Sequence, residues 1–278
     1  MSHAVPAVDD ALPAYHVSAA MPSEPFENKI HEDDLARVYG FKGGLVPGVT
    51  VYAWMTHPVV AALGESWLAR GSAWARFAKP VYYEEEAVVQ ARVAERAAGA
   101  VSLDLAVLNS AGELCATGQA ALGPLEGAVP DLARYPAAPL PEERPPASRE
   151  ALETREHLGT PWLHLEPATA AGFLDKYSER LPLYRGPGAP LHPAIYLDLG
   201  NRALDRNVRM NPWIHVESEV RHLGPARVGE RLEMRGRVER LFEKKGHEFA
   251  TLDLLLLAEG SRPVAVVRHT AIYKLRPA

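Results

Sequence analysis

The sequence predicts an α+β protein made of two similar units in tandem, each an apolar helix followed by antiparallel strands. The first observation is a stretch with seven prolines between residues 123 and 150, which is typical of a stiff, extended connector. It divides the 278 residues into two pieces of domain size. We therefore expect an N-terminal unit over 1–123, a linker over 124–150 and a C-terminal unit over 151–278.

The second observation is that the two pieces repeat one pattern. Val46-Pro47-Gly48-Val49 and Leu191-His192-Pro193-Ala194 each precede an apolar helical stretch, and residues 46 and 191 are 145 positions apart. Arg76 and Arg221 each begin a segment that ends in proline four residues later, at the same offset of 145. Leu103-Asp104-Leu105 matches Leu252-Asp253-Leu254 at 149, so the second copy should have a hairpin longer by four residues. A constant offset predicts an internal duplication.

The third observation is the order of elements within each copy. The stretch 49–63 is apolar on nearly every face, so the helix that it predicts must be covered all round. Alternating apolar residues between glycine-containing turns predict the strands, and a sheet curled around each helix would give two units that form a pseudo-dimer. The predicted helices are 34–39, 49–63 and 195–199, and the predicted strands are 74–77, 87–95, 102–109, 114–122, 214–222, 231–241, 248–258 and 264–275.

Bulk composition narrows the classes of function. The apolar fraction is 47% and the charged fraction 23%, as in ordinary globular proteins. A net charge of −5 argues against a nucleic-acid partner. The sequence has no apolar run long enough for a bilayer, no leader pattern and one cysteine, Cys115, so we expect no membrane partner, no disulfide and a cytoplasmic location.

Residues 28–50 carry the most specific pattern of the chain. Asn28-Lys29-Ile30-His31 precedes a short acidic helix that stops at Gly40-Phe41, and Pro47-Gly48 then opens the apolar helix. This segment resembles the signature of the MaoC-like (R)-specific enoyl-CoA hydratases, Asp-x-Asn-Pro-(Ile/Leu)-His, Gly-Phe and a His-Gly pair. Three positions depart from it: Phe26 stands in place of the family aspartate, Lys29 in place of proline, and Pro47 in place of the first member of the His-Gly pair.

The resemblance implies a double-hotdog fold and chemistry on an acyl thioester. In the family this histidine and aspartate activate water for addition to an enoyl-CoA double bond, so His31 is the predicted general base or acid, with Asn28 orienting it or the water. Gly48 would offer a helix-end N–H to the thioester carbonyl. Glu27, beside the phenylalanine, is the candidate carboxylate. The alternatives are a His31 that only caps the acidic helix, a solvated Glu27 and a Gly48 required only by a tight turn.

Other residues and patterns leave the ligand partly open. Arg76 and Lys79 could bind the phosphates of a CoA ligand, or could pair with glutamates across the sheet. No phosphate-binding loop, dinucleotide motif, nucleophile elbow or zinc motif occurs, so we predict no cofactor and no metal. The expected partner is an acyl-CoA or acyl-carrier-protein thioester, and a further homodimer stays open. A non-catalytic acyl-thioester-binding protein and an acyl-CoA thioesterase are the rival functions.

Overall fold

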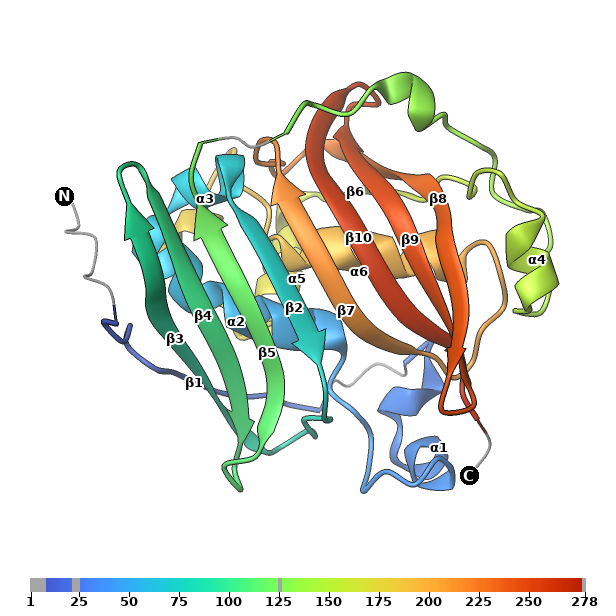
Figure 1. The fold of residues 1–278 in the computed structure, drawn as a ribbon, viewed down its shortest axis with the longest axis horizontal. Coiled ribbons are helices and arrows are strands. Elements are labelled where there is room, and N and C mark those ends of the chain that lie inside the picture. Colours follow the sequence, from blue (N-terminus) through green and yellow to red (C-terminus); the bar gives the residue numbers. More distant parts are fainter. Residues whose placement is uncertain (1–8, 22–25, 125–126, 277–278) are drawn as a thin grey trace.

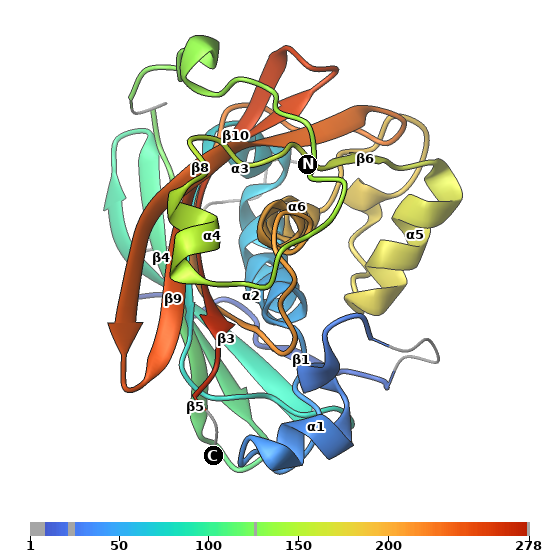
Figure 2. The same cartoon turned by 90° about the vertical axis from the view of Figure 1, so that its right-hand side faces the viewer.

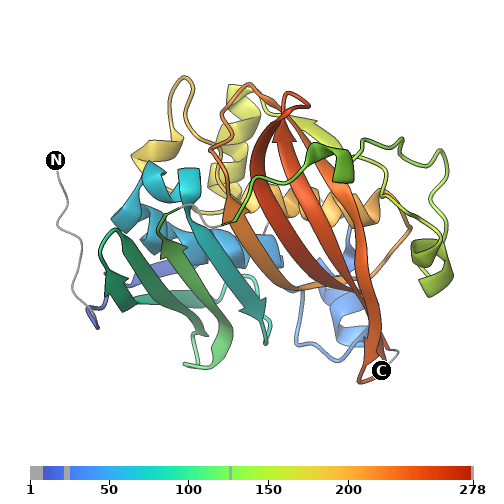
Figure 3. The ribbon, with the colours of Figure 1, turned by 45° about the horizontal axis from the view of Figure 1, so that its top comes forward.

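The computed structural model describes residues 9–21, 26–124 and 127–276. Their strands form one ten-stranded sheet, ordered β1-β3-β4-β5-β2-β7-β10-β9-β8-β6 (Figure 1). Read outward from its centre, β2-β5-β4-β3-β1 is mirrored by β7-β10-β9-β8-β6, so the two units are the halves of one sheet that joins at β2 and β7. Figure 3 shows the halves side by side on either side of this seam.

The predicted helices and strands are all present. Their ends differ by at most three residues, except that the helix predicted over 195–199 extends to Asp205. Further elements accompany them. The sequence did not predict the short elements β1, α3, α4, β6 and α5, because periodicity is read over windows of about 11 residues or more and each of these is shorter. In chain order the helices and strands are β1 Tyr15–Ser18, α1 Asp33–Val38, α2 Gly48–Leu63, α3 Glu65–Arg70, β2 Ser72–Phe77, β3 Glu86–Ala97, β4 Ala100–Asn109, β5 Leu114–Leu122, α4 Arg149–Glu153, β6 Trp162–His164, α5 Pro167–Lys176, α6 Ala194–Asp205, β7 Ile214–His222, β8 Arg231–Lys244, β9 His247–Ala258 and β10 Arg262–Lys274.

The strand register shows the internal duplication, because equivalent residues of the two halves occupy equivalent positions in the sheet. At the seam Trp74 pairs with Glu219, which lies 145 residues later, so the pseudo-twofold axis passes between them. In the hairpins, Val93 pairs with Leu103 and Val238 pairs with Leu252, which reproduces the offsets of 145 and 149. A β-bulge follows Val93 in one copy and Val238 in the other. The prediction that the second hairpin is longer by four residues is therefore confirmed.

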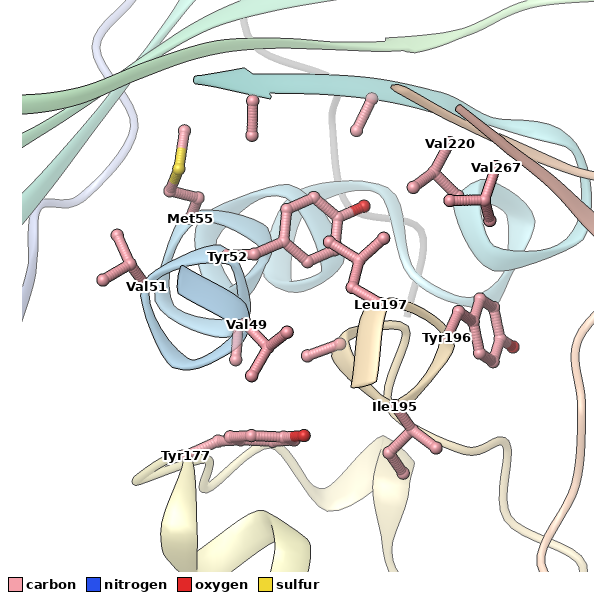
Figure 4. Close-up of a cluster of buried hydrophobic side chains, with 14 of the residues drawn as sticks. Val49, Val51, Tyr52, Met55, Tyr177, Ile195, Tyr196, Leu197, Val220 and Val267 are labelled. Atoms are coloured by element: carbon pink, nitrogen blue, oxygen red, sulfur yellow. The ribbon is translucent and has the colours of Figure 1, made fainter. Parts of the chain in front are cut away.

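Two helices, α2 and α6, lie side by side on one face of the sheet (Figure 2). Eleven residues of α2 are buried, as its apolar faces predict. The sheet covers one side of the helix pair through residues such as Val220 and Val267, and Tyr177, which follows α5, covers the other (Figure 4). Burial of this kind is worth roughly 1.5–3 kcal/mol for each large apolar side chain, so the pair of helices forms the main core.

The proline-rich connector packs more closely than an extended linker would. Tyr135 is buried, and its hydroxyl donates to Asp253 Oδ1 at 2.7 Å. Its ring belongs to a small cluster with Leu255 and Leu257 on the sheet. A short 3-10 helix, Leu132–Arg134, brings the tyrosine there. Part of the connector is therefore packed against the sheet, because the Tyr135 ring finds an apolar contact there and its hydroxyl a partner. No helix in the described part of the chain is long and apolar enough to cross a bilayer.

Candidate active site

A cavity of about 370 Å³ lies where the two halves meet at the start of α2. This volume falls in the range of small-molecule sites, roughly 300–1,000 Å³. The first half contributes the stretch around His31, the entrance of α2 and the end of β2. The second half contributes the start of β7 and the tip of the β8–β9 hairpin. The lining residues that carry polar or charged side chains are Asn28, His31, Arg76, Lys79, Asn201, Trp213, His215, Lys244, Lys245 and His247.

His31 ends a short 3-10 helix, Lys29–His31. Its Nδ1 lies 2.7 Å from the carbonyl oxygen of Leu45, which can only accept, so Nδ1 carries the proton and Nε2 keeps its lone pair. Burial lowers the pKa of His31 to about 4, although the bond to Leu45 opposes this shift. The ring is therefore neutral near pH 7, with Nε2 available as a base.

Asn28 joins the two halves at this point. Its Nδ2 donates to the carbonyl oxygen of Trp213 at 2.8 Å, and its Oδ1 accepts from the Trp213 N–H at 3.3 Å. The same side chain caps the 3-10 helix at Ile30 and lies 3.4 Å from His31 Nε2. A buried amide with these partners holds one orientation, so Asn28 fixes the approach to the imidazole and ties the first-half motif to β7.

Gly48 begins α2, directly after Pro47. The first N–H groups of a helix have no acceptor within it, and the positive end of the helix dipole lies there. A Cβ at Gly48 would lie only 2.9 Å from Nδ1 of His215. Glycine is thus required by the close approach of His215 from the second half, and Gly48 itself lines the cavity.

The structure does not bring Glu27 to this cavity. Its side chain is 80% exposed and pairs with Arg206 at 3.2 Å. Phe26 faces the motif instead, with its ring 5.2 Å from that of His31. No aspartate or glutamate occurs among the described residues that line the cavity.

The cationic residues at the mouth come from both halves. Lys79 and Arg76, the candidates for binding phosphates, line the cavity, but Lys79 pairs with Glu113 at 2.8 Å and Arg76 lies 3.9 Å from Glu217, one of the glutamates across the sheet. Lys244 and Lys245, which the sequence analysis missed, are exposed and form no ion pair with any described residue. They lie at the tip of the longer second hairpin. The four-residue difference between the copies was the signal that could have indicated them.

His215 is the second imidazole of the cavity, and sequence reasoning missed it as well. It is 5% exposed and packs edge-on against Phe77, with ring centroids 4.7 Å apart. Its counterpart 145 residues earlier is Arg70, so the internal repeat gives no hint of a role for a histidine there. Among the described residues no three His, Cys, Asp or Glu side chains converge as a metal-binding group would require.

Comparison with known proteins supports the fold and leaves the reaction open. No protein-family profile matches the sequence, and no curated protein matches it. Solved structures do match. A protein from Chloroflexus aurantiacus, provisionally described as a MaoC domain dehydratase, is 12% identical with a TM-score of 0.67, over 99% of this chain and 100% of that one.

Two other matches extend the comparison. A conserved hypothetical protein of Mycobacterium tuberculosis, described as a double hotdog fold, is 14% identical with a TM-score of 0.60 over 96% of each chain. A provisionally described thioesterase from Novosphingobium aromaticivorans is 16% identical with a TM-score of 0.58, over 94% of this chain and 95% of that one. The chain therefore has the double-hotdog fold of MaoC-like proteins, which thioesterases share.

Proposed function

We propose that this protein is a MaoC-like hydratase or dehydratase that interconverts 2-enoyl and (R)-3-hydroxyacyl thioesters of CoA or a carrier protein. One observation carries the proposal: a neutral imidazole with an unprotonated Nε2, His31, lines the same cavity as the N-terminus of a buried helix at Gly48. Hydration of an enoyl thioester needs a base for water and a group that stabilises negative charge on the thioester oxygen.

In the hydration direction, His31 Nε2 takes a proton from water while the water oxygen bonds to Cβ of the substrate. The electrons of the double bond move toward the thioester carbonyl, whose oxygen gains negative charge at the first N–H groups of α2. The imidazolium of His31 can then return its proton to Cα, which regenerates the neutral ring. Asn28, held by Trp213, positions the imidazole for this proton transfer.

The two ends of the cavity suit the two ends of such a substrate. Apolar side chains of both halves, including Val51, Ile214 and Phe249, line the cavity and can contact an acyl chain. Lys244 and Lys245 at its mouth have no ion-pair partner in the described part of the chain, so they can bind phosphate groups.

A non-catalytic acyl-thioester-binding protein is the second candidate. The observation that favours it is the composition of the lining, in which the described residues include no carboxylate, while Phe26 stands where the related motif has aspartate. A thioesterase is a third candidate, because the same fold occurs in proteins described as thioesterases. These candidates differ in the product: hydrated thioester, unchanged thioester or free thiol.

The test is turnover of crotonyl-CoA and a longer 2-enoyl-CoA by the wild type and by His31→Ala. Loss of the base should lower hydration by roughly a hundredfold or more, with the far-ultraviolet circular dichroism unchanged. His164→Ala, at an exposed histidine of β6, is the matched control and should retain full activity. A folded wild type that binds the thioester without hydrating it favours the binding protein, and release of free CoA favours the thioesterase.

A further inference from the structure

A chain of four buried or half-buried polar side chains in the second half links two residues of the cavity lining, His215 and Asn201, through Ser218 and His269. Nε2 of His215 lies 2.8 Å from Ser218 Oγ, and this hydroxyl lies 2.9 Å from Nδ1 of His269. Nε2 of His269 lies 2.9 Å from Oδ1 of Asn201 on α6. The two imidazole rings stack at 4.3 Å. At the His215 end, Nδ1 of the ring is buried and has no hydrogen-bond partner among the described residues.

The chemistry of these groups fixes where each proton lies. An amide oxygen can only accept, so Nε2 of His269 carries a proton for Asn201. Burial lowers the pKa of His269 to about 3, so the ring is neutral and its Nδ1 accepts from the Ser218 hydroxyl. The serine oxygen then accepts from Nε2–H of His215. Burial, together with the neighbouring His269, lowers the pKa of His215 well below its usual range. The free Nδ1 is therefore left with a lone pair and no proton.

We infer that Nδ1 of His215 is a fixed hydrogen-bond acceptor for the 3-hydroxyl group of a 3-hydroxyacyl thioester, which makes His215 a specificity-determining residue. This inference rests on the proposed function. A buried acceptor without a partner is unfavourable in the free protein, and a ligand O–H relieves it. The relay of Ser218, His269 and Asn201 keeps the ring in the accepting tautomer, so these three are positioning residues.

The position of His215 Nδ1 favours the 3-hydroxyl over the other hydrogen-bond donors of such a ligand. Nδ1 lies 2.9 Å from the point where a Cβ of Gly48 would be, which puts it beside the helix end that would hold the thioester carbonyl. The 3-hydroxyl is two carbons from that carbonyl on the acyl side. The amide N–H groups of a CoA arm lie beyond the sulfur, toward Lys244 and Lys245 at the mouth.

The experiment compares the equilibrium binding of (R)-3-hydroxybutyryl-CoA and butyryl-CoA, which differ only in the hydroxyl, and checks the bound species by chromatography. We expect the wild type to prefer the hydroxylated ligand by roughly five- to tenfold, the value of one neutral hydrogen bond. His215→Phe should remove this preference while leaving the affinity for butyryl-CoA within about twofold. Ser218→Ala should reduce the preference, since it frees the His215 tautomer.

His222→Phe is the matched control. His222 lies on the same strand, is fully buried, also has unpartnered ring nitrogens within the described chain, and is outside the cavity lining. Its counterpart 145 residues earlier is Phe77, so phenylalanine is compatible with the fold at that position in the other copy. This variant should keep the wild-type preference. If His222→Phe loses it as His215→Phe does, the preference reflects packing and the inference fails.

A second measurement does not depend on ligand or on folding of the phenylalanine variant. Nitrogen-15 NMR of the free wild type should show an unprotonated Nδ1 at His215, and Ser218→Ala should show a mixture of tautomers. A protonated Nδ1 in the wild type overturns the inference. If hydration is absent but the hydroxyl preference depends on His215, the proposed function fails and the inference stands. If hydration occurs and His215→Phe keeps the preference, only the inference fails.

Discussion

The chain enters the two central helices, α2 and α6, by the same backbone path, but the start of α2 lines a cavity whereas the start of α6 is buried. Before α2, the Val46 N–H donates to Val81 O at 2.8 Å, and before α6, the Leu191 N–H donates to Ala226 O at 2.7 Å, both partners being 145 residues apart. At α2 the next residues, Pro47 and Gly48, are half-buried and line a cavity. At α6 the residues 145 positions later, His192 and Pro193, are buried, and so is Ala194 at the start of the helix.

Side chains account for the difference. Rings of Tyr177 and Tyr184 pack 5.3 and 4.7 Å from that of His192, and the Glu179 carboxylate is buried beside it. His192 Nδ1 accepts from the Ala194 N–H at 3.2 Å, so it serves as a structural residue of the helix entrance. The duplicated fold thus provides two equivalent helix entrances. Aromatic side chains fill the entrance of α6, while a cavity lies at the entrance of α2. The second half contributes to the candidate site through residues that line the cavity beside the first-half motif, such as His215, Lys244 and Lys245.

The largest effect should come from the carboxylate in the filled entrance. Glu179 accepts from the backbone N–H groups of Arg180 and Leu181 at 2.7 Å and from His57. Glu179→Gln should cost roughly 3 kcal/mol of unfolding free energy, as breaking a buried pair does. Glu27→Gln, at the exposed carboxylate beside the open entrance, should change it by less than about 0.5 kcal/mol and leave enoyl-CoA turnover unchanged. Urea unfolding and the hydration assay measure the two quantities.

The difference in unfolding free energy between wild type and Glu179→Gln should depend on pH. Burial would raise the pKa of Glu179, but the adjacent His192 ring and hydrogen bonds from His57 and the Leu181 N–H hold it well below its usual range. A carboxylate whose pKa is depressed by folding stabilises the protein above its unfolded pKa, near 4.3, and loses this contribution as pH falls. The gap between wild type and Glu179→Gln should therefore be full above about pH 5 and shrink toward pH 3. A gap that widens on acidification would contradict this account.

The next largest effect should come from replacing Gly48, the glycine at the start of α2. Gly48→Ala places a methyl group 2.9 Å from Nδ1 of His215, so the ring or the helix end must move. We expect hydration to fall by roughly ten- to a hundredfold with a stability loss of about 1–3 kcal/mol. Ala194→Gly at the filled entrance should leave hydration unchanged and cost about 1 kcal/mol at most. Equal losses of activity in both variants would show that the entrances do not differ in function.

The smallest effect concerns the two unequal hairpins. In the first copy the turn is Ala98-Gly99, and in the second it follows Lys244 and is Lys245-Gly246. Replacing both lysines by alanine should raise KM for a CoA thioester by roughly five- to tenfold at low salt, and less at high salt. The KM for the corresponding pantetheine thioester, which lacks the nucleotide phosphates, should not change. Lys274→Ala, at a lysine already paired with Glu248, is the control, and an equal rise for both thioesters would exclude phosphate binding.

Much of the fold could be predicted because the signals for it are local or repeated. The apolar faces of 49–63, the alternation in the strands and the offsets of 145 and 149 each depend on residues close in sequence or on a comparison of the two copies. They were enough to anticipate three of the helices (α1, α2 and α6), the eight long strands and the extra four residues of the second hairpin. At the site, Asn28, His31 and Gly48 line one cavity because all three lie within one short segment.

What the sequence determined by itself, then, is the repeated unit and the short polar motif at the start of its first helix. Only the tertiary structure decided that β2 and β7 join into one sheet, that Glu27 turns outward to Arg206, and that His215 and the Lys244–Lys245 tip reach the cavity of the other half. The physical reason is that these contacts join residues more than 130 positions apart. Their side chains meet because of how the two halves pack, which no local pattern records.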